Sequence, residues 1–172
     1  MPRLLVIPLS SLSDTLAAHE PSHLISLLSP EHMIQTPAGF PAHMHLRLGI
    51  NDIVDPSAGT APPARQHIDE LLAFSRSWDA KKPLLIHCWA GISRSMASAF
   101  TILNDRLGPG SEIQIARAMR QRAPHAQPNR LLVSHADDAL GRGGRMVGAL
   151  NSMGPPVLVE EGVITAFPLV GL

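Results

Sequence analysis

The sequence predicts an α/β fold, in which a central, mostly parallel sheet of four to five strands is flanked by helices. Two observations lead to this fold class: short apolar runs of strand length alternate with amphipathic helical patterns, and helical patterns alone follow. The length of 172 residues suits one domain with a substantial core. We therefore expect residues 1–172 to form a single domain, with residues 141–172 as a C-terminal extension whose packing the sequence leaves open.

Four segments have the patterns of strands. Residues 4–9 and 23–28 are short apolar runs. Residues 43–50 alternate between apolar and polar side chains, which is typical of a half-buried strand. Residues 83–87 are apolar on both faces, as expected of a strand in the middle of a sheet.

Helical spacing of apolar residues predicts four helices, over residues 64–78, 93–107, 111–122 and about 128–140. Pro62 and Pro63 suit the opening of the first. Ser111 and Gln114 resemble a capping box, and Gly141 suits the end of the fourth helix. The glycine-rich residues 141–146 are interpreted as an exit turn. The tail, residues 155–172, is either a strand or an extended arm.

Composition bounds the partners. Apolar residues make up 45% of the chain and charged residues 16%, as in folded proteins. Fourteen basic side chains balance fourteen acidic ones, so nothing calls for nucleic acid or a membrane as a partner. No apolar stretch approaches the roughly 20 residues of a membrane helix. The single cysteine cannot form an internal disulfide, and we expect a cytoplasmic location.

That cysteine stands in the stretch IHCWAGISRS, residues 86–95. Cys88 is expected to end a strand, and residues 89–93 to turn the chain into a helix near Arg94. Such a loop points successive N–H groups inward and forms an anion-binding nest. Ala90 and Gly91 keep the loop unobstructed. The planar fork of Arg94 can grip two phosphate oxygens, and the same positive surroundings stabilise a thiolate at Cys88.

This stretch resembles the signature of the cysteine-dependent protein tyrosine phosphatases, a Cys-x5-Arg phosphate loop between a central strand and a helix. The loop is most similar to those of the dual-specificity branch, and the chain resembles a small bacterial-type member. Residues 119–133, with the pair Pro128 and Asn129, are similar to the segment that follows the signature helix there. The resemblance covers about residues 1–140.

The resemblance implies a mechanism. Cys88 attacks phosphorus and forms a cysteinyl-phosphate intermediate. Arg94 and the N–H groups of residues 89–94 hold the phosphoryl oxygens. Ser95 hydrogen-bonds the sulfur as it leaves, and no metal or cofactor is required. His87 orients the loop from behind or is a packed structural residue. The substrate-binding residues implied are His87, Trp89, Ala90, Gly91, Ile92, Ser93 and Arg94.

The family supplies the leaving group with a proton from an aspartic acid on a separate loop. Asp52 and Asp55 are the candidates here, because both follow the alternating strand on a loop rich in Pro, Gly and Ser. Asn51 with Asp52 resembles a pair found in some dual-specificity members. Asp55 precedes Pro56 and suits a turn. We favour Asp52.

The expected substrate is a phosphorylated protein or a small phosphomonoester. The chain has no tyrosine to stand over an incoming ring, which favours a shallow cleft. Lipid-directed relatives tend to carry a lysine in the loop, and residues 89–93 contain none. Trp89 lines the cleft mouth or packs behind the loop. His43 and His45 share a strand face, which we interpret as solvated rather than metal-binding.

Two other functions compete with the phosphatase. One is a pseudophosphatase that binds a phosphoprotein without turnover. The other is a sulfur-transfer enzyme, which also uses a thiolate in an anion loop. The sequence predicts neither the physiological substrate nor an oligomeric state.

Overall fold

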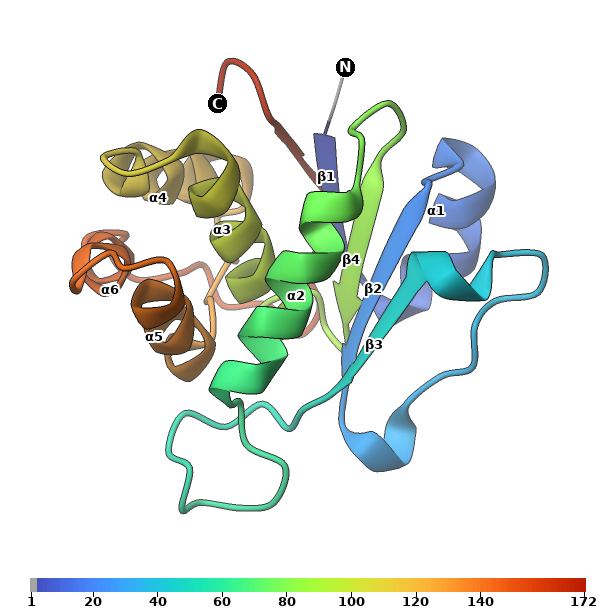
Figure 1. Cartoon of the computed structure of the whole chain (residues 1–172), viewed down its shortest axis with the longest axis horizontal. Coiled ribbons are helices and arrows are strands. Elements are labelled where there is room, and N and C mark those ends of the chain that lie inside the picture. The colour runs from blue at the N-terminus through green and yellow to red at the C-terminus, as the bar shows by residue number, and fades with distance from the viewer. Residues whose placement is uncertain (1–2) are drawn as a thin grey trace.

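The computed structural model describes residues 3–172 and contains a five-stranded sheet with helices on both faces (Figure 1). The strands are β1 (Arg3–Pro8), β2 (His23–Leu28), β3 (His45–Gly49), β4 (Leu84–Cys88) and β5 (Thr165–Pro168). Their order across the sheet is β3-β2-β4-β1-β5. The first four are parallel, and β5 runs antiparallel to β1. The predicted mostly parallel sheet is confirmed, with β4 at its centre.

The helices are α1 (Leu12–His19), α2 (Arg65–Ser77), α3 (Arg94–Leu107), α4 (Glu112–Arg122), α5 (Arg130–Ala139) and α6 (Arg145–Asn151). Short 3-10 turns occupy Leu9–Ser11, Pro30–His32 and Ala42–Met44. The four predicted helices correspond to α2–α5, whereas α1 and α6 were not predicted. None of the helices within residues 3–172 has the length and apolar character needed to cross a membrane.

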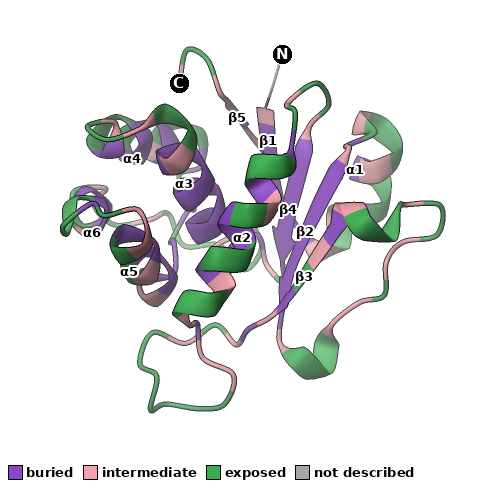
Figure 2. Ribbon diagram, viewed as in Figure 1, coloured by how far each residue is buried: buried purple, intermediate pink, exposed green. Residues whose placement is uncertain are grey.

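The sheet separates two apolar cores of unequal size. Figures 1 and 2 show α1 on one face of the buried sheet and the other five helices against the opposite face. Strand residues alternate between these cores, so Ile86 and Cys88 face the larger one, while Leu85 belongs to the smaller. Cys88 therefore lies on the side of α3, and His87 points to the side of α1.

Local details differ from the predictions at several places. The strand predicted over residues 43–50 is β3, which begins only at His45 after a 3-10 turn, and α6 begins at Arg145, inside the predicted exit turn. The prediction of a capping box at the start of α4 is wrong. The Ser111 hydroxyl donates to the carbonyl of Gly108, and the Glu112 carboxylate accepts from the N–H of Gly110 at 2.9 Å. The tail was predicted to be either a strand or an extended arm, and it contains both. Residues 155–164 form an extended arm, and β5 follows it.

Candidate active site

The loop between β4 and α3 is held open by its neighbours. The carbonyls of Trp89, Ala90, Ile92 and Ser93 accept hydrogen bonds of 2.8–3.3 Å from N–H groups outside the loop, those of Leu9, Gly162, Gln127 and Asn129 in that order. Within residues 3–172 the N–H groups of residues 90–93 donate to no backbone carbonyl. With its carbonyls turned outward, the loop is left with free N–H groups, as the predicted anion nest requires.

Gly91 has a further role that the sequence did not predict. It does not line the cavity described below, but packs against the end of β1 with φ +70°. A Cβ at this position would lie 2.7 Å from the backbone nitrogen of Pro8 and 2.8 Å from the carbonyl carbon of Ile7. Only glycine fits, because both the backbone conformation and the contact with the strand exclude a side chain.

Replacing Gly91 by alanine should lower the free energy of unfolding by about 3 kcal/mol or more. Gly141→Ala is the matched control, since Gly141 has φ +62° and no described residue comes within 4 Å of the position of its added Cβ. That control should cost only about 1 kcal/mol, from the backbone conformation alone. Urea unfolding of both variants measures the difference, and equal losses would show that the contact with β1 is unimportant.

The thiol of Cys88 lies at the base of the loop. Its side chain is nearly buried, yet it lines the cavity. The Cys88 sulfur lies 3.1 Å from the hydroxyl of Ser95, which is the second residue of α3 and fully buried. The helix thus begins beside the sulfur, and its N-terminal partial charge favours an anion there. The predicted pairing of Cys88 and Ser95 is present in the geometry.

Arg94 folds back across the loop, as the spacing predicts. Its Nη1 donates to the carbonyl of Ile50 at 2.7 Å, just after β3, and its Nε is buried with no acceptor within residues 3–172. The guanidinium therefore ties the loop to the segment that leads to Asp52, and it keeps an unsatisfied donor. A buried N–H of this kind is costly unless a ligand accepts from it.

The surroundings of Asp52 and Asp55 distinguish the two candidates for the general acid. Asp52 lines the cavity, and its Oδ1 accepts from the Ser93 hydroxyl at 2.7 Å and from Nδ2 of Asn129 at 2.8 Å. Two donors on Oδ1 leave Oδ2 as the oxygen that can carry a proton. Asp55 is exposed, lies outside the cavity, and accepts from the N–H and hydroxyl of Ser57 in a local turn. Those bonds lower its pKa, so Asp55 stays ionised.

The sequence analysis named Asn129 as part of a pair with Pro128, but it did not predict the contacts of its side chain. Its side-chain amide donates to Asp52 and, at 3.1 Å, to the carbonyl of Ile53, while its Oδ1 accepts from the N–H of Leu132 and caps α5. Its own N–H donates to Ser93. One buried residue thus joins the acid loop, the phosphate loop and a helix start.

These residues border a cavity of about 800 Å³. Of the predicted site residues, those at its wall are Asp52, Cys88, Trp89, Ala90, Ile92, Ser93 and Arg94. Trp89 is 59% exposed, so it lies at the mouth of the cleft and does not pack behind the loop. The far wall comes from Arg120 of α4, from residues 126–130 between α4 and the start of α5, and from the end of α6 with the residues after it.

His87 does not reach the cavity; it lies behind the loop in a buried polar chain. Its Nδ1 lies 3.3 Å from the carbonyl of Cys88, and its Nε2 lies 2.6 Å from the hydroxyl of Ser26. That hydroxyl is 2.8 Å from Nε2 of His45, whose Nδ1 is 3.0 Å from the hydroxyl of Thr36. The expected solvated face is therefore wrong for His45, which is buried, although His43 is exposed.

The hydrogen-bond partners determine which nitrogen of each imidazole in this polar chain carries the proton. A carbonyl only accepts, so Nδ1 of His87 carries its proton and Nε2 accepts from Ser26. Ser26 must then accept from Nε2 of His45, which leaves Nδ1 of His45 to accept from Thr36. Both imidazoles are neutral, and burial lowers the pKa of each from 6.5 to about 4. The chain supports the backbone of Cys88 from the opposite face of the sheet.

These histidines predict how stability depends on pH. Since their pKa values are lower in the folded than in the unfolded protein, the unfolded chain binds more protons between pH 6.5 and about 4. The free energy of unfolding should fall as the pH drops through that range, by roughly 3 kcal/mol for each fully coupled histidine. Urea unfolding should show a shallower pH slope in His45→Gln and an unchanged slope in His43→Gln. A slope unaltered by His45→Gln would contradict this account.

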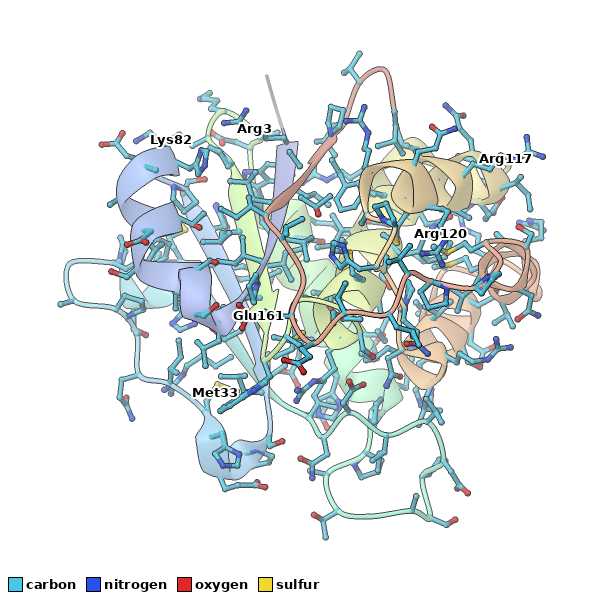
Figure 3. The ribbon with its side chains drawn as sticks, turned by 180° about the vertical axis from the view of Figure 1, so that it is seen from behind. Arg3, Met33, Lys82, Arg117, Arg120 and Glu161 are labelled. Carbon is cyan, nitrogen blue, oxygen red and sulfur yellow. The ribbon has the colours of Figure 1, made fainter. Side chains whose placement is uncertain are left out.

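The C-terminal extension packs against the phosphate loop and the cavity wall. The sequence did not predict these contacts. The N–H of Gly162 donates to the Ala90 carbonyl at 2.8 Å. A Cβ on Gly162 would lie 2.7 Å from Nε2 of the buried His125. Arg120 donates to the carbonyls of Met153 and Gly154 at 3.2 Å. Figure 3 shows Arg120 beside this arm, which runs on past Glu161 toward β5.

Comparison with protein-family models gives no match, and neither does comparison with curated proteins. Solved structures do match. DUSP15 aligns with a TM-score of 0.61 at 20% identity, over 89% of this chain and 91% of that chain. The human tyrosine phosphatase-like serine/threonine/tyrosine-interacting protein gives 0.60 at 20%, over 83% and 94%. PTPMT1 in complex with PI(5)P gives 0.56 at 18%, over 81% and 94%. The chain therefore has the fold of the dual-specificity phosphatases, as the resemblance implied.

Proposed function

We propose that this protein is a metal-independent phosphomonoester hydrolase that acts on phosphorylated proteins through a cysteinyl-phosphate intermediate. The observation that carries this proposal is the convergence of Cys88, Arg94 and Asp52 on one cavity, at the end of a loop with free N–H groups. A nucleophile, an anion clamp and a proton donor are the groups that two-step phosphoryl transfer needs.

In the first step the Cys88 sulfur attacks phosphorus as the bond from phosphorus to the leaving oxygen breaks. The loop N–H groups and the free Nε of Arg94 bind the phosphoryl oxygens, and Oδ2 of Asp52 gives its proton to the leaving oxygen. In the second step water attacks phosphorus as the bond from sulfur to phosphorus breaks, Asp52 takes a proton from that water, and inorganic phosphate leaves. Ser95 stabilises the departing thiolate with its hydroxyl.

Two features favour a phosphoprotein as substrate. The loop has no lysine, unlike the loops of lipid-directed relatives. Beside its arginines, the cavity is also lined by apolar side chains and by amides, which suit contacts with a polypeptide. Because the mechanism needs Cys88 reduced, we also propose that the protein works in a reducing compartment such as the cytoplasm.

The phosphate-binding module is the second candidate. It is favoured by the likeness to a protein whose name describes it as phosphatase-like and interacting. An intact set of Cys88, Arg94, Ser95 and Asp52 favours the enzyme instead.

Hydrolysis of para-nitrophenyl phosphate and of peptides phosphorylated on Tyr, Ser or Thr, between pH 5 and 8 with a chelator present, tests the proposal. We expect turnover that the chelator does not reduce. A folded protein that binds tungstate but hydrolyses none of these compounds would be a binding module.

A further inference from the structure

The extended arm that precedes β5 borders the cavity near both of its ends. Pro156 lines the cavity, and the N–H of Gly162 donates to the carbonyl of Ala90, which also lines it. The part of the arm between these two points therefore follows the rim of the cavity, outside the phosphate loop. Figure 3 shows the arm at the surface, where it passes Arg120 and Glu161.

Exposed apolar side chains gather on this arm. Five of the ten large apolar side chains that are exposed in residues 3–172 lie within residues 157–164. Leu158 is the extreme case, with 86% of its surface exposed. A group of apolar side chains left in water beside a binding cavity marks a surface that a partner covers.

The backbone of the arm is also left unpaired. Within the described part of the chain, the N–H and carbonyl groups of residues 158–160 make no hydrogen bond. Both flanks are fixed, because the N–H of Val157 donates to the carbonyl of Pro124 at 2.9 Å and β5 pairs with β1. Residues 155–159 contain no turn or bend. The arm is thus an extended edge, already held in place, that offers free donors and acceptors.

The chemistry of this edge indicates what covers it. Free N–H and carbonyl groups on an extended edge are satisfied by another extended backbone, which adds as a strand. A lipid bilayer suits it less, because hydrocarbon cannot satisfy those groups. Glu160 is exposed and makes no ion pair among the described residues, which favours a basic side chain in the added strand. Because the arm continues the cavity wall at Pro156, a protein whose phosphorylated residue enters the cavity also reaches the arm.

We propose, resting on the proposed function, that the arm binds an extended apolar segment of the phosphoprotein substrate by strand addition. The segment pairs with the backbone of residues 158–160, packs apolar side chains against Val157 and Leu158, and places a lysine or arginine near Glu160. At about 3.3 Å per extended residue, roughly three to seven residues separate this segment from the phosphorylated one. The arm is thus a specificity-determining surface.

Binding of fluorescent phosphotyrosine peptides to the Cys88→Ser protein tests this without turnover. Two probes carry the segment Lys-Val-Thr-Val, one on each side of the phosphotyrosine, behind a Gly-Ser spacer of about four residues. A third probe carries Lys-Ser-Gly-Ser, which has the same charge. One of the two apolar probes should bind about tenfold more tightly than the third. In a Cys88→Ser, Leu158→Ser protein this preference should fall to about threefold or less.

Val170→Ser is the matched control, because Val170 is exposed, follows β5 and lies outside the cavity. This variant also loses an exposed apolar side chain, and it should keep the full preference. Methylation of alternate backbone amides in the tighter probe tests the pairing itself. One alternate set should abolish the preference and the other should keep it, because only every second N–H of an added strand faces the arm. An equal loss with both sets would overturn strand addition.

Equal affinities for the three probes, no binding of any of them, or an equal loss in Leu158→Ser and Val170→Ser would overturn the inference. Sedimentation supplies a further test. If the wild type were a dimer that Leu158→Ser converts into a monomer, a second copy of the chain would cover the arm, and the inference would be wrong.

Hydrolysis of para-nitrophenyl phosphate by the wild type separates this inference from the proposed function. Turnover together with equal probe affinities leaves the phosphatase intact and removes only the docking surface. Without turnover, the preference for the apolar probe and its loss in Leu158→Ser still decide the inference, now for a binding module.

Discussion

Replacing Cys88 by serine is expected to abolish hydrolysis of para-nitrophenyl phosphate, with a loss on the order of 10⁵-fold or more in kcat. A serine hydroxyl is a poor nucleophile unless a base removes its proton. The adjacent imidazole cannot serve, because both nitrogens of His87 are engaged, with Ser26 and with the Cys88 carbonyl, behind the loop.

The phosphate loop itself should survive this change. Its carbonyls and Arg94 are held by contacts that do not involve the sulfur, so the N–H groups should keep their positions. Calorimetric titration with tungstate should therefore give a dissociation constant within a few-fold of the wild-type value. Residual turnover above a few per cent, with an unchanged affinity for the anion, would remove Cys88 from the chemistry.

Asp52→Asn should lower kcat/KM by about 10²-fold or more for phenyl phosphate, whose leaving group needs a proton. The effect should be much smaller for para-nitrophenyl phosphate, because nitrophenolate leaves readily without one. The asparagine still accepts from Ser93 and Asn129, so the loop geometry is retained.

Asp55→Asn makes the same chemical change three residues away. Within residues 3–172 its carboxylate hydrogen-bonds to Ser57 alone, and it lies outside the cavity, so both substrates should be hydrolysed at wild-type rates. A series of aryl phosphates of rising leaving-group pKa measures both variants. If the two substitutions had the same dependence on leaving group, Asp52 would not be the acid.

The sequence predicted the parts of the site that are local in the chain. Cys88, the loop and Arg94 lie within one strand–loop–helix unit, so their spacing alone predicts their arrangement. Asp52 was favoured over Asp55 by resemblance and because Asp55, which precedes Pro56, suits a turn. The structure separates them through Ser93 and Asn129, which are distant in the sequence.

The parts that were missed depend on long-range contacts. Helix α6 follows glycine-rich residues, and its start is capped by the Asp137 carboxylate of α5, which accepts from the N–H groups of Gly144 and Met146. Helix α1 has only eight residues and two buried side chains, which gives little periodicity. The chain from His87 to Thr36 joins three strands and a loop, and no local pattern reveals it.

Trapping of the phosphorylated enzyme tests the central claim most directly. Ser95→Ala should slow the second step, so rapid acid quenching after mixing with ³²P-labelled phosphopeptide should leave label on the protein. The account predicts that the label maps to the peptide containing Cys88 and is absent in a Cys88→Ser, Ser95→Ala protein. Label on another residue would contradict the account. Steady turnover in the wild type with no label on either the wild-type or the Ser95→Ala protein would also contradict it.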